Sequence, residues 1–119
     1  MPTHVKGRRV YLSGPMTGIE DYNRAAFDRA ALDVMDAGAD EVYDPAEHID
    51  EYAQLSHERC MALSLRELIA EILWVDEVEP YYDMLVSLPG WEKSAGATLE
   101  REVAIACGIE VCELAEVVE

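Results

Sequence analysis

Residues 88–108 read LPGWEKSAGATLEREVAIACG. This stretch follows an apolar run that begins at Met84, passes through a polar loop with glycines, and takes on the spacing of a helix from about residue 96 to 107. Glu100 and Glu102 are expected in the first turn of that helix, where backbone N–H groups and the macrodipole stabilise an ionised carboxylate. Such a carboxylate either acts as a nucleophile on a bound ligand or simply offsets the helix dipole.

The rest of the chain repeats this alternation of short apolar runs and helical spacing. Strands are predicted at Val10–Leu12, Glu41–Tyr43, Met84–Leu88 and Ile109–Cys112, helices at about 22–37, 60–74 and 96–107, and a surface loop or short helix at 46–57. Strands that alternate with helices indicate right-handed crossovers and a parallel sheet. The sequence therefore predicts an open three-layer α/β fold, Rossmann-like or flavodoxin-like, with about four to five strands. Without a linker or repeat, residues 1–119 are expected to form one domain.

The composition is that of a globular and strongly acidic protein, with 50% hydrophobic residues, 29% charged residues and a net charge of −16. A surface of this sign repels a long nucleic acid, so no nucleic-acid polymer is expected as a partner. One phosphate of a small nucleotide can still be held by local backbone N–H groups. The chain has no apolar run of about 18 residues and no signal-peptide pattern, so we expect a cytoplasmic protein that does not enter a membrane.

The three cysteines and three histidines do not have the spacing of a metal site, so no metal is predicted and the thiols are expected to be reduced. His57 opens a predicted helix and is interpreted as solvated. His48 either borders a ligand pocket or lies on the surface.

The loop after the first strand, Ser13–Gly18, combines two glycines, two hydroxyls and several free N–H groups. These groups suit a phosphate or a sugar hydroxyl, although an ordinary tight turn has the same composition. The loop matches neither a Walker motif nor the dinucleotide-binding glycine pattern. It and the loop at 89–96 both leave the carboxyl ends of strands, so they are expected to face one pocket.

Three segments, Val10–Met16, Tyr43–Glu47 and Leu88–Gly108, resemble in order and spacing the nucleoside 2-deoxyribosyltransferase-like superfamily. The closest resemblance is to its small branch from phages and actinobacteria, and it covers about residues 8 to 112. It implies that a tyrosine of the first strand and a glycine-rich loop hold the substrate. It also implies that a glutamate of the last long helix attacks the anomeric carbon of the sugar.

In that superfamily the glutamate is followed four residues later by a small residue and eight residues later by glycine. Ala104 and Gly108 place Glu100 in this frame, and Glu102 does not fit it. The resemblance therefore implies that Glu100 is the nucleophile and that Tyr11 is the first-strand tyrosine that helps to hold the substrate. Tyr11 either orients Glu100 through a hydrogen bond or is an ordinary strand aromatic.

Six residues before the nucleophile the base-exchange enzymes of the superfamily carry an aspartate, whereas this chain has Ser94. The nucleotide N-glycosidase branch is similar here, with a serine that contacts the 5′-phosphate, so the resemblance favours nucleoside monophosphates. A further aspartate serves the leaving base, and Asp76 is the nearest match, with Glu67 and Asp83 as rivals. The superfamily needs no metal, and no cofactor is expected.

The expected substrate-binding residues come from the two strand-end loops, and Trp91 among them either stacks on a base or anchors its loop. They are Ser13, Gly14, Pro15, Met16, Gly18, Trp91, Ser94 and Gly96. The catalytic residues expected are Glu100, Tyr11 and Asp76.

These residues predict an enzyme that cleaves the N-glycosidic bond of a nucleoside 5′-monophosphate, by hydrolysis or base exchange, through a covalent sugar–Glu100 intermediate. A sensor that holds a nucleotide without turning it over is the alternative, and a pure assembly protein is a third. The apolar segment Cys60–Trp74 exceeds what one face of a four-stranded sheet needs, so we expect a homodimer or higher homo-oligomer.

Overall fold

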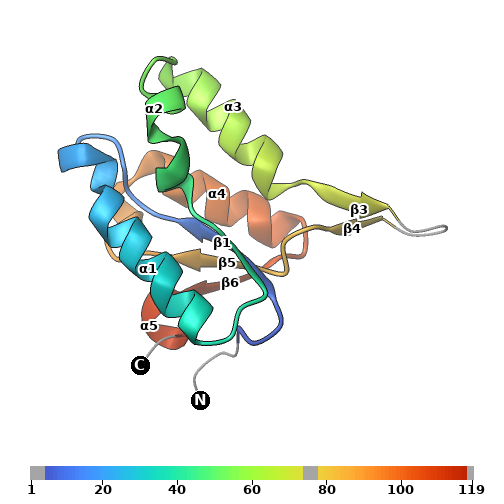
Figure 1. Cartoon of the computed structure of the whole chain (residues 1–119). Helices are drawn as coiled ribbons and strands as arrows, with labels where there is room; N and C mark the ends of the chain where they lie inside the picture. The colour runs from blue at the N-terminus through green and yellow to red at the C-terminus, as the bar shows by residue number, and fades with distance from the viewer. Residues whose placement is uncertain (1–4, 74–77, 118–119) are drawn as a thin grey trace.

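The computed structural model describes residues 5–73 and 78–117, and its helices and strands alternate along most of the chain (Figure 1). Short 3₁₀ helices are marked η. In chain order the elements are β1 (Arg9–Ser13), η1 (Glu20–Asn23), α1 (Arg24–Asp36), β2 (Glu41–Tyr43), η2 (Pro45–His48), α2 (Ile49–Tyr52), α3 (His57–Leu68), β3 (Glu71–Leu73), β4 (Val78–Pro80), β5 (Met84–Ser87), η3 (Trp91–Lys93), α4 (Ala95–Ala106), β6 (Glu110–Glu113) and α5 (Leu114–Val117).

The central sheet has four strands in the order β2-β1-β5-β6, and every neighbouring pair is parallel. Strand β1 lies in the middle, with Tyr11 paired to Tyr43 on one side and to Leu85 on the other. Successive β1 side chains point to opposite faces, and both faces are covered, which explains why the strand is buried from Val10 to Ser13 and apolar from Val10 to Leu12. The predicted open parallel α/β fold is confirmed.

Helices cover the two faces of the sheet and complete three layers (Figure 1). On one face Val10 and Leu12 join a buried cluster with Phe27 and Val34 of α1. On the other face Tyr11 joins a second cluster with Leu68 of α3 and Ala104 of α4. The long helices therefore divide between the faces, as ordinary crossover connections require.

The helix predicted at 60–74 begins three residues earlier, at His57, and the prediction was wrong for 69–73, while residue 74 lies outside the described residues. Helix α3 ends at Leu68, and β3 then pairs antiparallel with β4 in a separate two-stranded sheet (Figure 1). The backbone N–H of Tyr81 donates to the carbonyl of Ala70 at 2.7 Å, so the chain returns to its starting point after this excursion. Apolar residues at 69, 72 and 73 fit a helical spacing and a short strand equally well, and isoleucine favours the strand.

Other boundaries agree closely with the sequence. Strands β1, β2 and β5 fall where they were predicted, and β6 is displaced by one residue. The segment 46–57 forms the short helices η2 and α2, followed by the start of α3, and the one-turn helix α5 was not predicted. Ahead of α1, three consecutive residues from Asp21 to Asn23 have positive φ angles of 50°, 53° and 65°. Such angles are uncommon outside glycine and mark a strained turn.

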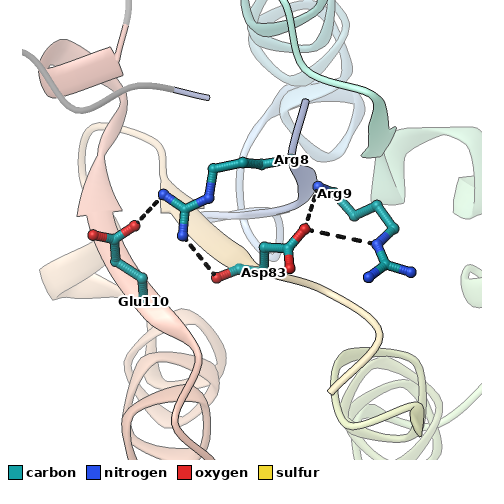
Figure 2. Close-up of polar contacts among 4 residues, drawn as sticks. All are labelled: Arg8, Arg9, Asp83 and Glu110. Carbon is teal, nitrogen blue, oxygen red and sulfur yellow. Dashed lines mark hydrogen bonds and ion pairs between the residues drawn. The ribbon is translucent and has the colours of Figure 1, made fainter. Parts of the chain in front are cut away.

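The amino ends of β1, β5 and β6 are tied together by two arginines (Figure 2). Arg8 donates to the carboxylate of Glu110 and to the carbonyl of Asp83, whose carboxylate accepts from the backbone N–H of Arg9 at 2.9 Å. The Arg9 guanidinium lies 3.7 Å from the same carboxylate. These contacts lie at the amino ends of the strands. The loops discussed below follow the carboxyl ends, on the opposite side of the sheet.

Within residues 5–73 and 78–117, no helix has the length and apolar character needed to cross a membrane.

Candidate active site

The loops after β1 and β5 start side by side, because Ser13 and Ser87 are paired at the carboxyl ends of these neighbouring strands. Gly14 permits their close approach: a Cβ atom here would lie 2.8 Å from Cβ of Leu88 and 3.3 Å from Cζ of Phe27. Both neighbours are fully buried, so they have little room to move. Glycine at position 14 is therefore a packing requirement of this strand-end arrangement.

A cleft of about 730 Å³ opens above these strand ends, between the two loops and helices α2 and α3. Its lining comes from the loop after β1 and from η1 (Gly14, Pro15, Met16, Thr17, Ile19, Tyr22, Asn23), from α2, α3 and the residue between them (Ile49, Tyr52, Ala53, His57, Cys60, Met61, Ser64), and from the loop after β5 with α4 (Pro89, Gly90, Lys93, Ser94, Ala95, Gly96, Ala97, Glu100). The structure therefore brings the two predicted loops to one cavity, as expected from their places after parallel strands.

Glu100 lies at the base of this cleft with only 8% of its surface exposed. Both carboxylate oxygens accept hydrogen bonds: Oε1 from the Ser13 hydroxyl at 3.0 Å, and Oε2 from the Tyr11 hydroxyl. Burial raises the pKa of Glu100 to about 7, although the two hydrogen bonds act in the opposite direction. The carboxyl group thus changes its charge near neutral pH.

The source of this stabilisation differs from the sequence-based expectation. Helix α4 begins at Ala95 and has no acidic residue in its first turn, so Glu100 lies in the second turn. Its ionised form is stabilised by Tyr11 and Ser13 rather than by the free N–H groups of a helix end. Glu102 is exposed, in contrast to Glu100.

Tyr11 is a buried support for Glu100 and does not line the cleft itself. Its ring stacks on Tyr43 with centroids 5.0 Å apart and meets Tyr82 edge-on at 5.5 Å. Burial and the neighbouring Glu100 raise the pKa of Tyr11 well above its ordinary value, so it remains a hydrogen-bond donor. This geometry favours the orienting role over that of an ordinary strand aromatic.

The Tyr11 hydroxyl also lies 3.3 Å from the carbonyl oxygen of Ser64 on α3. A hydroxyl has a single proton, so it donates to Glu100 when that group is ionised. When Glu100 is protonated, its proton can point to the Tyr11 oxygen, and Tyr11 can donate to Ser64 instead. Tyr11 therefore has a partner in both charge states of Glu100.

Ser94 and Gly96 both line the cleft at the start of α4. Ser94 is the N-cap of this helix, and its Oγ accepts from the backbone N–H of Ala97 at 3.2 Å. Its hydroxyl proton is still available to a ligand. Lys93, the preceding residue, also lines the cleft and brings a positive charge to this end.

Trp91 makes its contacts away from the cleft lining. Its ring lies 3.9 Å from the guanidinium carbon of Arg101, and its Nε1 donates to Glu113 at 3.1 Å. It is not among the residues that line the cleft. These contacts favour the loop-anchoring interpretation of Trp91. Gly18 also lies outside the lining, and its φ of 84° shapes the turn instead.

The residue expected to assist the leaving base is not identified by these positions. Asp76 lies outside the described residues. Asp83 lies at the amino end of β5, where it binds Arg9. Glu67 does not line the cleft, and after burial it is the next cause of the raised pKa of Tyr82. Among the described residues, Glu100 is thus the one carboxylate of the lining.

The part of the cleft lining that α3 contributes was not predicted from the sequence. His57, Cys60, Met61 and Ser64 recur at intervals of three and four residues, the spacing of one helical face. This mixture of polar and apolar residues was the available signal. The sequence instead predicts a buried apolar face over Cys60–Trp74 and a solvated His57. His48 stacks on Tyr43 with centroids 5.5 Å apart and is not in the lining.

Comparison with known proteins gives one match. A family model described as "Domain of unknown function (DUF4406)" matches residues 8–113, nearly the whole chain. No curated protein and no solved structure matches.

Proposed function

The chain belongs to the DUF4406 family, a domain of unknown function, and we propose that it cleaves the N-glycosidic bond of a nucleoside 5′-monophosphate with Glu100 as nucleophile. The observation that carries this proposal is a single buried carboxylate at the base of a cleft, with Tyr11 and Ser13 bonded to its two oxygens. The resemblance of the strand-end segments to the nucleoside 2-deoxyribosyltransferase-like superfamily supports the same residue.

The chemistry needs a fixed carboxylate. Cleavage passes through an oxocarbenium-like centre at the anomeric carbon, which a nearby negative charge stabilises. An oxygen of Glu100 then forms a bond to that carbon while the bonding electron pair leaves with the base. Water or a second base completes the turnover by displacing Glu100 from the sugar. Tyr11 and Ser13 hold the carboxylate in one orientation, so little reorganisation is needed as the reaction proceeds.

Two groups of lining residues suit the phosphate and the base of a nucleotide. Lys93, Ser94 and the first N–H groups of α4 can hold a 5′-phosphate, because a helix N-terminus and a lysine both favour an anion. Met16, Ile19 and Tyr22 supply apolar and aromatic surface suited to a base. This arrangement favours monophosphates over free nucleosides. The proposed reaction uses no cofactor or metal.

A nucleotide sensor of the same fold is the second candidate. The observation that favours it is the burial of Glu100, which raises its pKa to about 7 and leaves part of the population protonated at neutral pH. A protonated carboxyl group is a poor nucleophile but can still donate a hydrogen bond to a ligand.

The two candidates are separated by incubation with ribo- and deoxyribonucleoside 5′-monophosphates, with free base measured by chromatography and binding by calorimetry. Release of base by the wild type, lost in Glu100→Gln, supports the enzyme. Binding of a nucleotide without release of base supports the sensor. If the protein neither binds nor cleaves any of these compounds, both candidates are wrong.

A further inference from the structure

Cleavage of an N-glycosidic bond also needs a proton donor for the departing base, a role that Glu100 does not fill. The departing base carries away the bonding electron pair, so a ring nitrogen needs a proton as the bond breaks. No second carboxylate lines the cleft within residues 5–73 and 78–117. The proton donor has to be sought among the other side chains of the lining.

His57 is the first residue of α3 and lines the cleft. The preceding residue, Ser56, caps the helix by accepting from the N–H of Arg59 at 3.2 Å, so the backbone of His57 is fixed. Its side chain is exposed, and none of the described residues forms a hydrogen bond or ion pair with the imidazole. The ring is therefore available to a ligand in the cleft.

The position of His57 relative to Glu100 follows from the geometry of α3. The Ser64 carbonyl lies beside the Tyr11 hydroxyl, which in turn binds Glu100, so Ser64 marks the base of the cleft. His57 precedes Ser64 by two turns on the same helical face, which corresponds to a rise of about 10 Å. This separation leaves room for a sugar next to Glu100 and a base that extends towards His57.

The other titratable groups of the lining are less suited to this task. Tyr52 shares a 3.0 Å hydrogen bond with Tyr43, and the Cys60 thiol lies 3.3 Å from the Tyr52 carbonyl oxygen, to which it donates. Lys93 stands beside Ser94 at the end proposed for the phosphate. Tyr22 lines the cleft and is partly exposed, and phenols hold their proton tightly near neutral pH. Histidine is the side chain best suited to proton transfer in that range.

We propose that His57 is the general acid that protonates the departing base, an assignment that rests on the proposed function. In the first step the imidazolium gives its proton to a ring nitrogen of the base while Glu100 bonds to the anomeric carbon and the C–N bond breaks. In the second step water attacks the anomeric carbon, its proton passes to the neutral imidazole, and the Glu100–sugar bond breaks. Both residues return to their starting charge.

The test compares two leaving bases in the wild type and in His57→Gln. A purine nucleoside 5′-monophosphate needs protonation of its base, whereas its 7-methyl derivative already carries a positive charge and leaves without an acid. For His57→Gln we expect a loss of about 10²- to 10⁴-fold in kcat on the ordinary nucleotide, and kcat on the 7-methyl nucleotide close to that of the wild type. His48→Gln, outside the lining, is the matched control and should behave as the wild type on both.

Two results would overturn the assignment of His57 alone: an equal loss on both nucleotides, or wild-type kcat on the ordinary one. If the wild type cleaves neither nucleotide nor any other monophosphate, the proposed function fails and the assignment fails with it. Circular dichroism of His57→Gln checks that the fold is intact, which we expect because the side chain is exposed.

Discussion

The Ser13 hydroxyl donates a 3.0 Å hydrogen bond to Oε1 of Glu100, although the two residues are 87 positions apart in the sequence. The bond joins the carboxyl end of β1 to the second turn of α4 and fixes one oxygen of the carboxylate. Tyr11 fixes the other from the same strand. The orientation of Glu100 therefore depends on the packing of α4 against the central sheet.

Replacing Glu100 with glutamine should abolish cleavage. The amide fills nearly the same volume but is a far weaker nucleophile and stabilises positive charge poorly, so we expect kcat to fall by at least about 10³-fold. Nucleotide affinity should change much less. Glu102→Gln is the matched control, because its side chain is exposed and is rotated by about 200° around the helix from Glu100. Comparable kcat values for the two variants would rule out Glu100 as the nucleophile.

Tyr11→Phe should shift the pH dependence of turnover. The Tyr11 hydrogen bond lowers the pKa of Glu100, which burial has raised to about 7. Without that bond the pKa rises further, so the increase of kcat with pH, centred near 7 in the wild type, should move to higher pH. A pH–rate profile of both proteins measures the displacement. A lower kcat with an unchanged profile would mean that Tyr11 has only a packing role.

The ionisation of Glu100 should also appear in the stability of the protein. The folded-state pKa of about 7 exceeds the ordinary value of 4.5, so the folded protein binds more protons between these pH values and the free energy of unfolding falls as pH rises through them. The difference corresponds to roughly 3 kcal/mol at most. Urea unfolding at pH 5 and pH 8 should show a smaller decrease for Glu100→Gln than for the wild type.

Asp44 has a raised pKa of about 7 as well, caused first by burial and then by its contact with Asp28. Its contribution has the same sign but is common to both proteins, so it cancels in the comparison of Glu100→Gln with the wild type. If the two proteins lose the same free energy of unfolding between pH 5 and pH 8, Glu100 does not hold its proton in the folded state.

Ser94→Ala should weaken the preference for a monophosphate over its nucleoside by about 10- to 100-fold, since one charge-assisted hydrogen bond is lost. The same substitution removes the cap of α4 and should lower the free energy of unfolding by about 1 kcal/mol. Ser56→Ala separates the two effects, because Ser56 caps α3 in the same way without lining the cleft. It should lower stability and leave the ratio of kcat/KM for the monophosphate and its nucleoside unchanged. Unchanged relative kcat/KM values for Ser94→Ala would exclude a phosphate contact.

The protein should associate with a second copy at micromolar concentration. Ile69, just after α3, and Ile105 on α4 are 43% and 63% exposed, and apolar surface of this kind favours burial between subunits. The net charge of −16 opposes association, so added salt should strengthen it. Sedimentation of the wild type and of Ile69→Glu tests this, with the variant expected to dissociate more readily. A wild type that remains monomeric and active contradicts the prediction.

The order of the main elements was predictable because each is encoded locally. Apolar runs such as Val10–Leu12 and the helical spacing of residues 22–37 depend only on neighbours in the chain, and the alternation of elements then dictates a parallel sheet. The end of α3 was not predictable in this way. Its apolar spacing continues past Leu68, and only the pairing of β3 with β4 determines that the chain becomes extended there.

The candidate site also has features that the sequence predicts and features that depend on contacts between distant residues. Loop positions after β1 and β5 were accessible from the sequence, since they depend on the ends of strands. The choice of Glu100 over Glu102 came from the resemblance to the superfamily. The hydrogen bond from Ser13 to Glu100 was not accessible from the sequence, because the two residues are 87 positions apart in the chain. The bond from Tyr11 was one of two alternatives, and the structure favours it. The position of Trp91 depends on its contacts with Arg101 and Glu113, and these contacts leave no local pattern. The lining residues of α3 do leave one, in their spacing of three and four residues.

The arginine contacts at the amino ends of the strands are separate from the loops that form the cleft. Arg8 and Arg9 connect β1, β5 and β6 at their amino ends, whereas the cleft lies at the carboxyl ends (Figure 2). None of the four residues in these contacts lines the cleft. Changes in the cleft loops can therefore alter what the cleft binds without removing the contacts that join the strands at their other end.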